Sequence, residues 1–74
     1  MKNMNLTAVI EPDGDGFTSL CPELDIASQG DNVQLAKENL REAVELFLEC
    51  ADPSEIQARL HTDVFVTRLE VAYA

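Results

Sequence analysis

The sequence predicts an α+β fold, in which an antiparallel sheet carries one main helix on one face in the order β-β-β-α-β. Three observations predict this class. Short runs with alternating apolar side chains flank a glycine-containing turn near the start of the chain. A long run with apolar residues every three or four positions follows, and a last alternating run comes after it. We expect residues 1–74 to form a single domain.

The first alternating runs predict a β-hairpin followed by a third strand. Residues 5–11 combine β-branched side chains with an apolar face. Residues 12–16 read Pro-Asp-Gly-Asp-Gly, which suits a tight turn, and residues 17–21 resume the extended pattern. A break over residues 22–25 then separates this strand from a short third one over residues 26–29.

The strongest local pattern predicts a helix over residues 33–51, with Asn32 or the preceding Asp31 as its N-cap. At about 100° per residue, one side is apolar and is expected to pack on the sheet: Val33, Ala36, Leu40, Ala43, Val44, Phe47 and Ala51. The opposite side is acidic and consists of Glu38, Glu42, Glu45 and Glu49. An apolar flank between them is either the edge of the core or a contact surface: Leu35, Leu46 and Cys50.

The rest of the chain predicts a short helix and a last strand. Residues 52–55 have the cap, proline and glutamate of a helix start, so a helical turn to about Leu60 is expected. Residues 61–73 then form a long extended segment. One face of it carries Phe65, Leu69, Val71 and Tyr73, and the other face carries Val64 and Val66.

We expect the chain to form a homo-oligomer, most simply a two-fold dimer. A core of this size is small, and it contains only three Phe and one Tyr as aromatic residues. A sheet covered by one helix would leave apolar groups of the last strand in water, and a strand at a sheet edge exposes unpaired backbone groups. The expected interface consists of Val64, Val66, Leu35 and Leu46.

Charge indicates the class of partner. The sequence has 14 Asp and Glu against 5 Lys and Arg, which gives a net charge of -9. Nucleic-acid binding needs clustered basic residues, so direct contact with DNA or RNA is not expected. An acidic chain suits a basic protein partner, and the glutamates Glu38, Glu42, Glu45 and Glu49 are the candidate binding residues. The alternative is that these glutamates form an ordinary solvated surface and the charge serves solubility.

No catalytic, metal or cofactor site is expected. His61 is the single histidine and has no cysteine close to it in sequence. The turn at residues 13–16 resembles the start of a calcium loop, but Leu24 stands where that loop needs a glutamate. Cys21 and Cys50 are expected to be small buried apolar residues in a reducing cytoplasm. No apolar stretch is long enough for a signal peptide or a membrane span.

Several segments, in a fixed order and spacing, resemble the HicB-like antitoxin domain: residues 6–11, Gly16-Phe17, Cys21-Pro-Glu-Leu24, Ser28-Gln-Gly-Asp31, and the helix with Ala36, Asn39, Leu40 and Ala43. The resemblance covers roughly residues 5–50, and the last strand, residues 64–72, extends it. Asp25-Ile26 depart from the Pro-Gly that is common in the family. Many members also carry a C-terminal DNA-binding unit, and we expect none here.

The resemblance implies a non-catalytic antitoxin that binds a small basic toxin of the HicA type, which cleaves messenger RNA with a histidine. By covering the toxin, the antitoxin would block access of RNA. One alternative is a stand-alone interaction or regulatory module of the same fold without a toxin partner. A second alternative is a metal-dependent nuclease, because the family's sheet has been likened to part of the ribonuclease H fold, although the central strands offer only Glu11.

Overall fold

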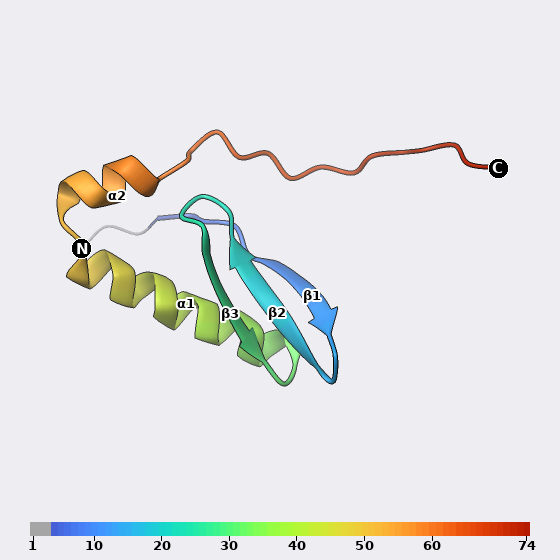
Figure 1. Cartoon of the computed structure of the whole chain (residues 1–74), viewed down its shortest axis with the longest axis horizontal. Coiled ribbons are helices and arrows are strands. Elements are labelled where there is room, and N and C mark those ends of the chain that lie inside the picture. The colour runs from blue at the N-terminus through green and yellow to red at the C-terminus, as the bar shows by residue number, and fades with distance from the viewer. Residues whose placement is uncertain (1–3) are drawn as a thin grey trace.

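The computed structural model describes residues 4–74, and in this range it contains one antiparallel sheet and two helices (Figure 1). The strands are β1 (Val9–Asp13), β2 (Gly16–Cys21) and β3 (Ile26–Gly30), and their order in the sheet is β1-β2-β3. The helices are α1 (Val33–Cys50) and α2 (Pro53–Arg59). Helix α1 packs mainly against β3 and β2. The α+β class, with one main helix on the sheet, is therefore confirmed.

The hairpin between β1 and β2 closes at the predicted glycine-containing turn. Gly14 has a φ of 61°, a left-handed conformation that glycine adopts without a steric penalty. The register places Asp13 opposite Gly16 and Val9 opposite Leu20. Strand β1 begins at Val9 rather than at residue 5, because the chain before it contacts the β2–β3 turn instead of continuing the sheet.

Helix α1 begins as the sequence predicts. The Asn32 side chain accepts a hydrogen bond from the Leu35 backbone nitrogen at 2.8 Å, which confirms Asn32 as the N-cap. Most of the predicted apolar side of α1 packs on the sheet. The buried apolar residues of α1, of β2 and of the turn after β2 form the core: Cys21, Leu24, Ala36, Leu40 and Val44. Val33 is an exception with 51 % of its surface exposed, because it lies in the first turn of α1, beyond the end of β3.

The prediction that both cysteines are buried is confirmed for one of them and wrong for the other. Cys21 is buried, whereas Cys50 is exposed, because it lies on the flank of α1 that turns away from the sheet. Leu35 and Leu46 on the same flank are 40 % and 60 % exposed. The apolar flank, Leu35, Leu46 and Cys50, is therefore surface in the single chain and not the edge of the core.

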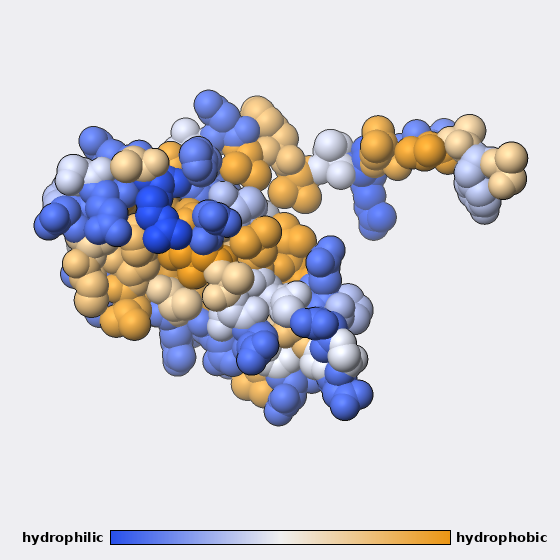
Figure 2. Space-filling model, viewed as in Figure 1, coloured by the Kyte–Doolittle hydropathy of each residue, from blue (hydrophilic) through white to orange (hydrophobic). Residues whose placement is uncertain are grey.

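The predicted closing strand is wrong for the single chain. Helix α2 forms as expected, and Leu60 after it packs against the core. Residues 60–74 then belong to no helix or strand, and after His61 the chain runs away from the sheet (Figure 1). Their backbone has no neighbouring strand to pair with, and a strand requires one. Figure 2 shows apolar side chains along this segment, away from the body of the molecule.

Candidate functional site

The acidic face of α1 consists of Glu38, Glu42, Glu45 and Glu49, and the structure brings all four onto one surface opposite the sheet. Glu42, Glu45 and Glu49 are exposed. Glu38 is partly exposed and accepts a hydrogen bond from Gln34 Nε2 at 3.0 Å. The sequence prediction that these side chains share one solvent-facing surface agrees with the structure, and their binding of a partner stays a prediction.

Basic residues lie on one side of this acidic face, and apolar residues lie on the other. Lys37 and Arg41 lie along one side, where they line a shallow cleft with Gln34 and Glu38. The apolar flank lies along the other side, because its residues project between the acidic and the buried sides of the helix. A protein that docks on α1 would therefore meet carboxylates at the centre and exposed leucine side chains beside them.

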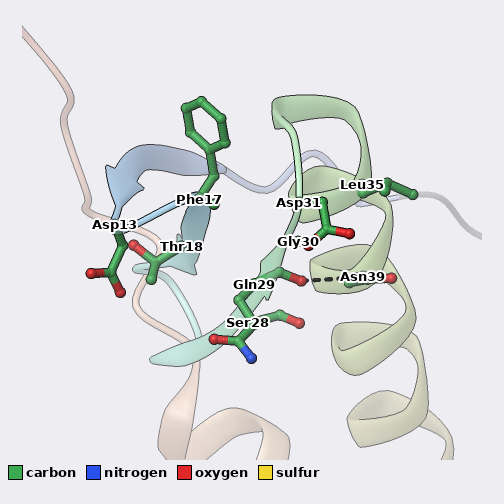
Figure 3. Close-up of a pocket in the computed structure, with 10 residues that line it drawn as sticks. Asp13, Phe17, Thr18, Ser28, Gln29, Gly30, Asp31, Leu35 and Asn39 are labelled. Atoms are coloured by element: carbon green, nitrogen blue, oxygen red, sulfur yellow. Dashed lines mark hydrogen bonds between the residues drawn. The ribbon is translucent and has the colours of Figure 1, made fainter.

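A second candidate site is an open cleft of about 570 Å³ where the sheet meets the start of α1 (Figure 3). It is lined by Asp13, Gly16, Phe17, Thr18, Ser28, Gln29, Gly30, Asp31, Leu35 and Asn39. Asn39 Nδ2 donates to the backbone oxygen of Gln29 at 2.8 Å and joins the helix to β3. Sequence reasoning missed this cleft, and its nearest signal was the Ser28-Gln-Gly-Asp31 segment.

The Pro22–Asp25 turn between β2 and β3 contains a buried acidic residue. Both carboxylate oxygens of Glu23 accept a hydrogen bond from the Thr7 backbone nitrogen at 3.0 Å, and Oε2 also accepts from Thr7 Oγ1 at 2.6 Å. The backbone oxygen of Glu23 accepts from the His61 nitrogen at 2.7 Å. Glu23 therefore joins the segment before β1 and the segment after α2 to the same turn, which is a structural role that sequence reasoning did not foresee.

Hydrogen bonding sets the protonation of this network. Burial raises the pKa of Glu23, but the hydrogen bonds from the Thr7 side chain and backbone outweigh it, so the pKa lies below its ordinary value. Burial also raises the pKa of the Cys21 thiol, whose Sγ lies 3.6 Å from Glu23 Oε1. Glu23 therefore accepts these hydrogen bonds as a carboxylate, and Cys21 donates as a neutral thiol.

The lowered pKa of Glu23 predicts loss of stability in acid. A carboxyl group whose pKa is lower in the folded state contributes stability above its unfolded pKa and loses it as the pH falls through the folded pKa. We expect the free energy of unfolding to decrease as the pH falls below about 4.5, the ordinary value for this group. Urea unfolding over a pH series should show this slope in the unmodified protein and a smaller slope in Glu23→Gln. The exposed Glu55→Gln is the control, and an equal slope in Glu23→Gln would contradict the prediction.

Neither metal-binding nor membrane-spanning features occur in the described part of the chain. Within residues 4–74, no group of three or more His, Cys, Asp or Glu side chains is placed to hold a metal ion. No helix in that range has the length and apolar character needed to cross a membrane.

Comparison with known proteins places the chain in a family. A UPF0150 protein of Helicobacter pylori strain J99 is 32 % identical to it over 72 residues, which cover 96 % of this chain and all of the relative. The chain belongs to the UPF0150 family. No family model and no solved structure matches it. Because the match spans almost the whole chain, the UPF0150 unit includes most of the segment after α2 as well as the sheet and α1.

Proposed function

We propose that this UPF0150 protein is an antitoxin of the HicB type, which binds a small basic HicA-type toxin and blocks its cleavage of messenger RNA. The observation that carries the proposal is the acidic face of α1, which is directed away from the sheet in a chain of net charge -9. The resemblance of residues 5–50 to HicB-like antitoxins supports it.

The proposed action is steric and electrostatic, without a chemical step on this chain. A toxin that binds RNA presents basic groups to the phosphates, and glutamate carboxylates can occupy the same positions. Opposite charge increases the rate of encounter, while the exposed Leu35 and Leu46 beside the acidic face add apolar area to bury. RNA is then excluded because its binding surface is covered.

The direct test uses the purified protein and the small basic protein encoded beside it. We expect the two to co-elute as a complex, and cleavage of messenger RNA by the basic protein to stop when the complex forms. A histidine-substituted, inactive form of the basic protein should bind equally well, which separates binding from cleavage. Continued RNA cleavage at saturating amounts of this chain would contradict the antitoxin proposal. It would favour a regulatory module of the same fold.

A charge reversal tests the acidic face itself. We expect Glu42→Lys with Glu45→Lys to slow association with the toxin several-fold at low salt, because the change removes electrostatic attraction. Both residues are exposed, so the fold should be unaffected. Stopped-flow or surface-binding measurements over a salt series would measure the association rate.

The matched control is Asp15→Lys with Asp63→Lys. Both residues are exposed and lie outside α1, one in the β1–β2 hairpin and one after α2, and the double change alters net charge by the same amount. We expect a smaller loss of association rate for this control. Equal rates for the two double variants would show that total charge matters rather than the acidic face. Rates that respond to neither change nor to salt would show that the face is ordinary solvated surface.

A further inference from the structure

In the C-terminal segment, residues 64–74, Val64 is partly buried and the large apolar side chains after it are exposed. Phe65, Leu69 and Tyr73 are 87 %, 86 % and 95 % exposed, and Val66 and Val71 are 67 % and 66 % exposed. In an extended chain, alternate residues share a face, so Phe65, Leu69, Val71 and Tyr73 form one apolar face. Contiguous apolar surface of this kind marks a site of interaction in a folded protein.

The sheet offers two edges to such a segment, and side chains occupy one of them. At β3, Asn39 Nδ2 bonds to the Gln29 backbone oxygen at 2.8 Å. Just before β3, Arg59 Nη2 bonds to the Asp25 backbone oxygen at 3.1 Å, and its guanidinium lies 4.9 Å from the centre of the Phe47 ring. Side chains that bond to outward backbone groups protect an edge from pairing with another strand.

The β1 edge is open by comparison. Among residues 4–74, no side chain bonds to the backbone of β1. Pro12 has no N–H, so at this position an added strand could donate to β1 but not accept from it. Helix α1 packs mainly on β3 and β2, so Ile10 beside Pro12 remains partly exposed. On the other face, Val9 lies opposite Leu20, which is 38 % exposed. A strand added at β1 would gain apolar neighbours on both faces.

We propose that the C-terminal segment of one copy adds as a strand to β1 of a second copy, and that the second copy returns the same contact across a two-fold axis. The backbone leaves the body at a fixed point, because Leu60 packs in the core and the His61 nitrogen bonds to the Glu23 oxygen. From there it extends away from its own β1 (Figure 1). Each chain thus carries both the added strand and the edge that accepts it. In a two-fold dimer, the backbone of β1 gains a hydrogen-bonded neighbour and the apolar side chains of the segment are covered, in both copies.

Charge distinguishes a second copy from a basic protein as the occupant. Residues 61–74 carry one Arg against one Asp and one Glu, so the segment is close to neutral and does not attract a basic protein as the acidic face of α1 does. The match to the UPF0150 relative covers 96 % of the chain and therefore includes most of this segment. The exchange is independent of the proposed toxin binding, which uses another surface.

The test is the mass of the full chain in solution, measured by light scattering at micromolar concentration. We expect twice the 8.2 kDa of one chain, and a monomer for Leu69→Asp with Val71→Asp. These residues are exposed and lie outside the core, so the helical circular-dichroism signal from α1 should stay unchanged, while the signal from the added strand is lost. The control is Leu46→Asp, a single change of the same type on the apolar flank of α1, which should remain dimeric.

Hydrogen exchange locates the contact. In the unmodified protein, backbone amides of β1 and of residues 64–73 should be protected, and both should lose protection in the Leu69→Asp, Val71→Asp variant. A monomeric unmodified protein would overturn the proposal, including one whose C-terminal segment is protected by its own β1. Dissociation by Leu46→Asp would place the interface on α1 and would overturn it as well.

Discussion

Replacement of Leu40 by alanine is expected to lower the free energy of unfolding by about 2 to 5 kcal/mol. Leu40 is 3 % exposed and packs in the core with Cys21, Leu24 and Val44, so truncation removes buried apolar surface and leaves a cavity. Small domains are stable by only about 5 to 15 kcal/mol in total. Thermal or urea unfolding followed by circular dichroism would measure the loss.

The same helix provides the control for this prediction. Leu46 is 60 % exposed, so Leu46→Ala removes little buried surface and should change stability by no more than about 0.5 kcal/mol. Similar melting temperatures for Leu40→Ala and Leu46→Ala would mean that Leu40 does not lie on the side of α1 that faces the sheet.

Gly30→Ala is expected to cost about 3 kcal/mol, at the upper end for overpacking. A methyl group on Gly30 would overlap the Ala36 backbone nitrogen and lie 2.7 Å from the Leu35 carbonyl carbon. These atoms belong to the helix backbone and cannot rotate away, so α1 would have to move off β3. We expect a lower melting temperature. We also expect loss of the hydrogen bond that Ser19 Oγ donates to the Ala36 backbone oxygen at 2.9 Å.

Gly14→Ala separates this collision from the general effect of replacing a glycine. A methyl group at Gly14 meets nothing within 4 Å, and the cost comes only from its left-handed φ of 61°. We expect about 1 kcal/mol for Gly14→Ala, which is less than for Gly30→Ala. The reverse order, measured by denaturant unfolding, would show that β3 and α1 are further apart than in this structure.

Local patterns in the sequence predicted most of the fold. The spacing of apolar residues located the sheet-facing side of α1 and, on the opposite side, the acidic face. Asn32 and Pro53 marked the two helix starts, and Gly14 marked the hairpin. Each of these features depends on residues within one or two turns of the chain, and such features can be inferred from neighbours in the sequence.

The features that were missed depend on residues far apart in the chain. Thr7 bonds to Glu23 across 16 positions, and Arg59 bonds to Asp25 across 34, so neither contact leaves a local pattern. The alternation in residues 61–73 correctly indicated an extended segment with an apolar face. It could not supply the neighbouring strand, and without a neighbour the segment is not part of a sheet in the single chain.

The contacts of Glu23 have a topological consequence. Its side chain holds Thr7 and its backbone holds His61, so the chain comes into the folded body and leaves it at neighbouring points. A body of this kind can be spliced into a surface loop of a host protein without stretching the host chain. It can also be circularly permuted, with residues 6 and 61 joined by a short linker and new ends opened at the solvent-facing Gly14 turn.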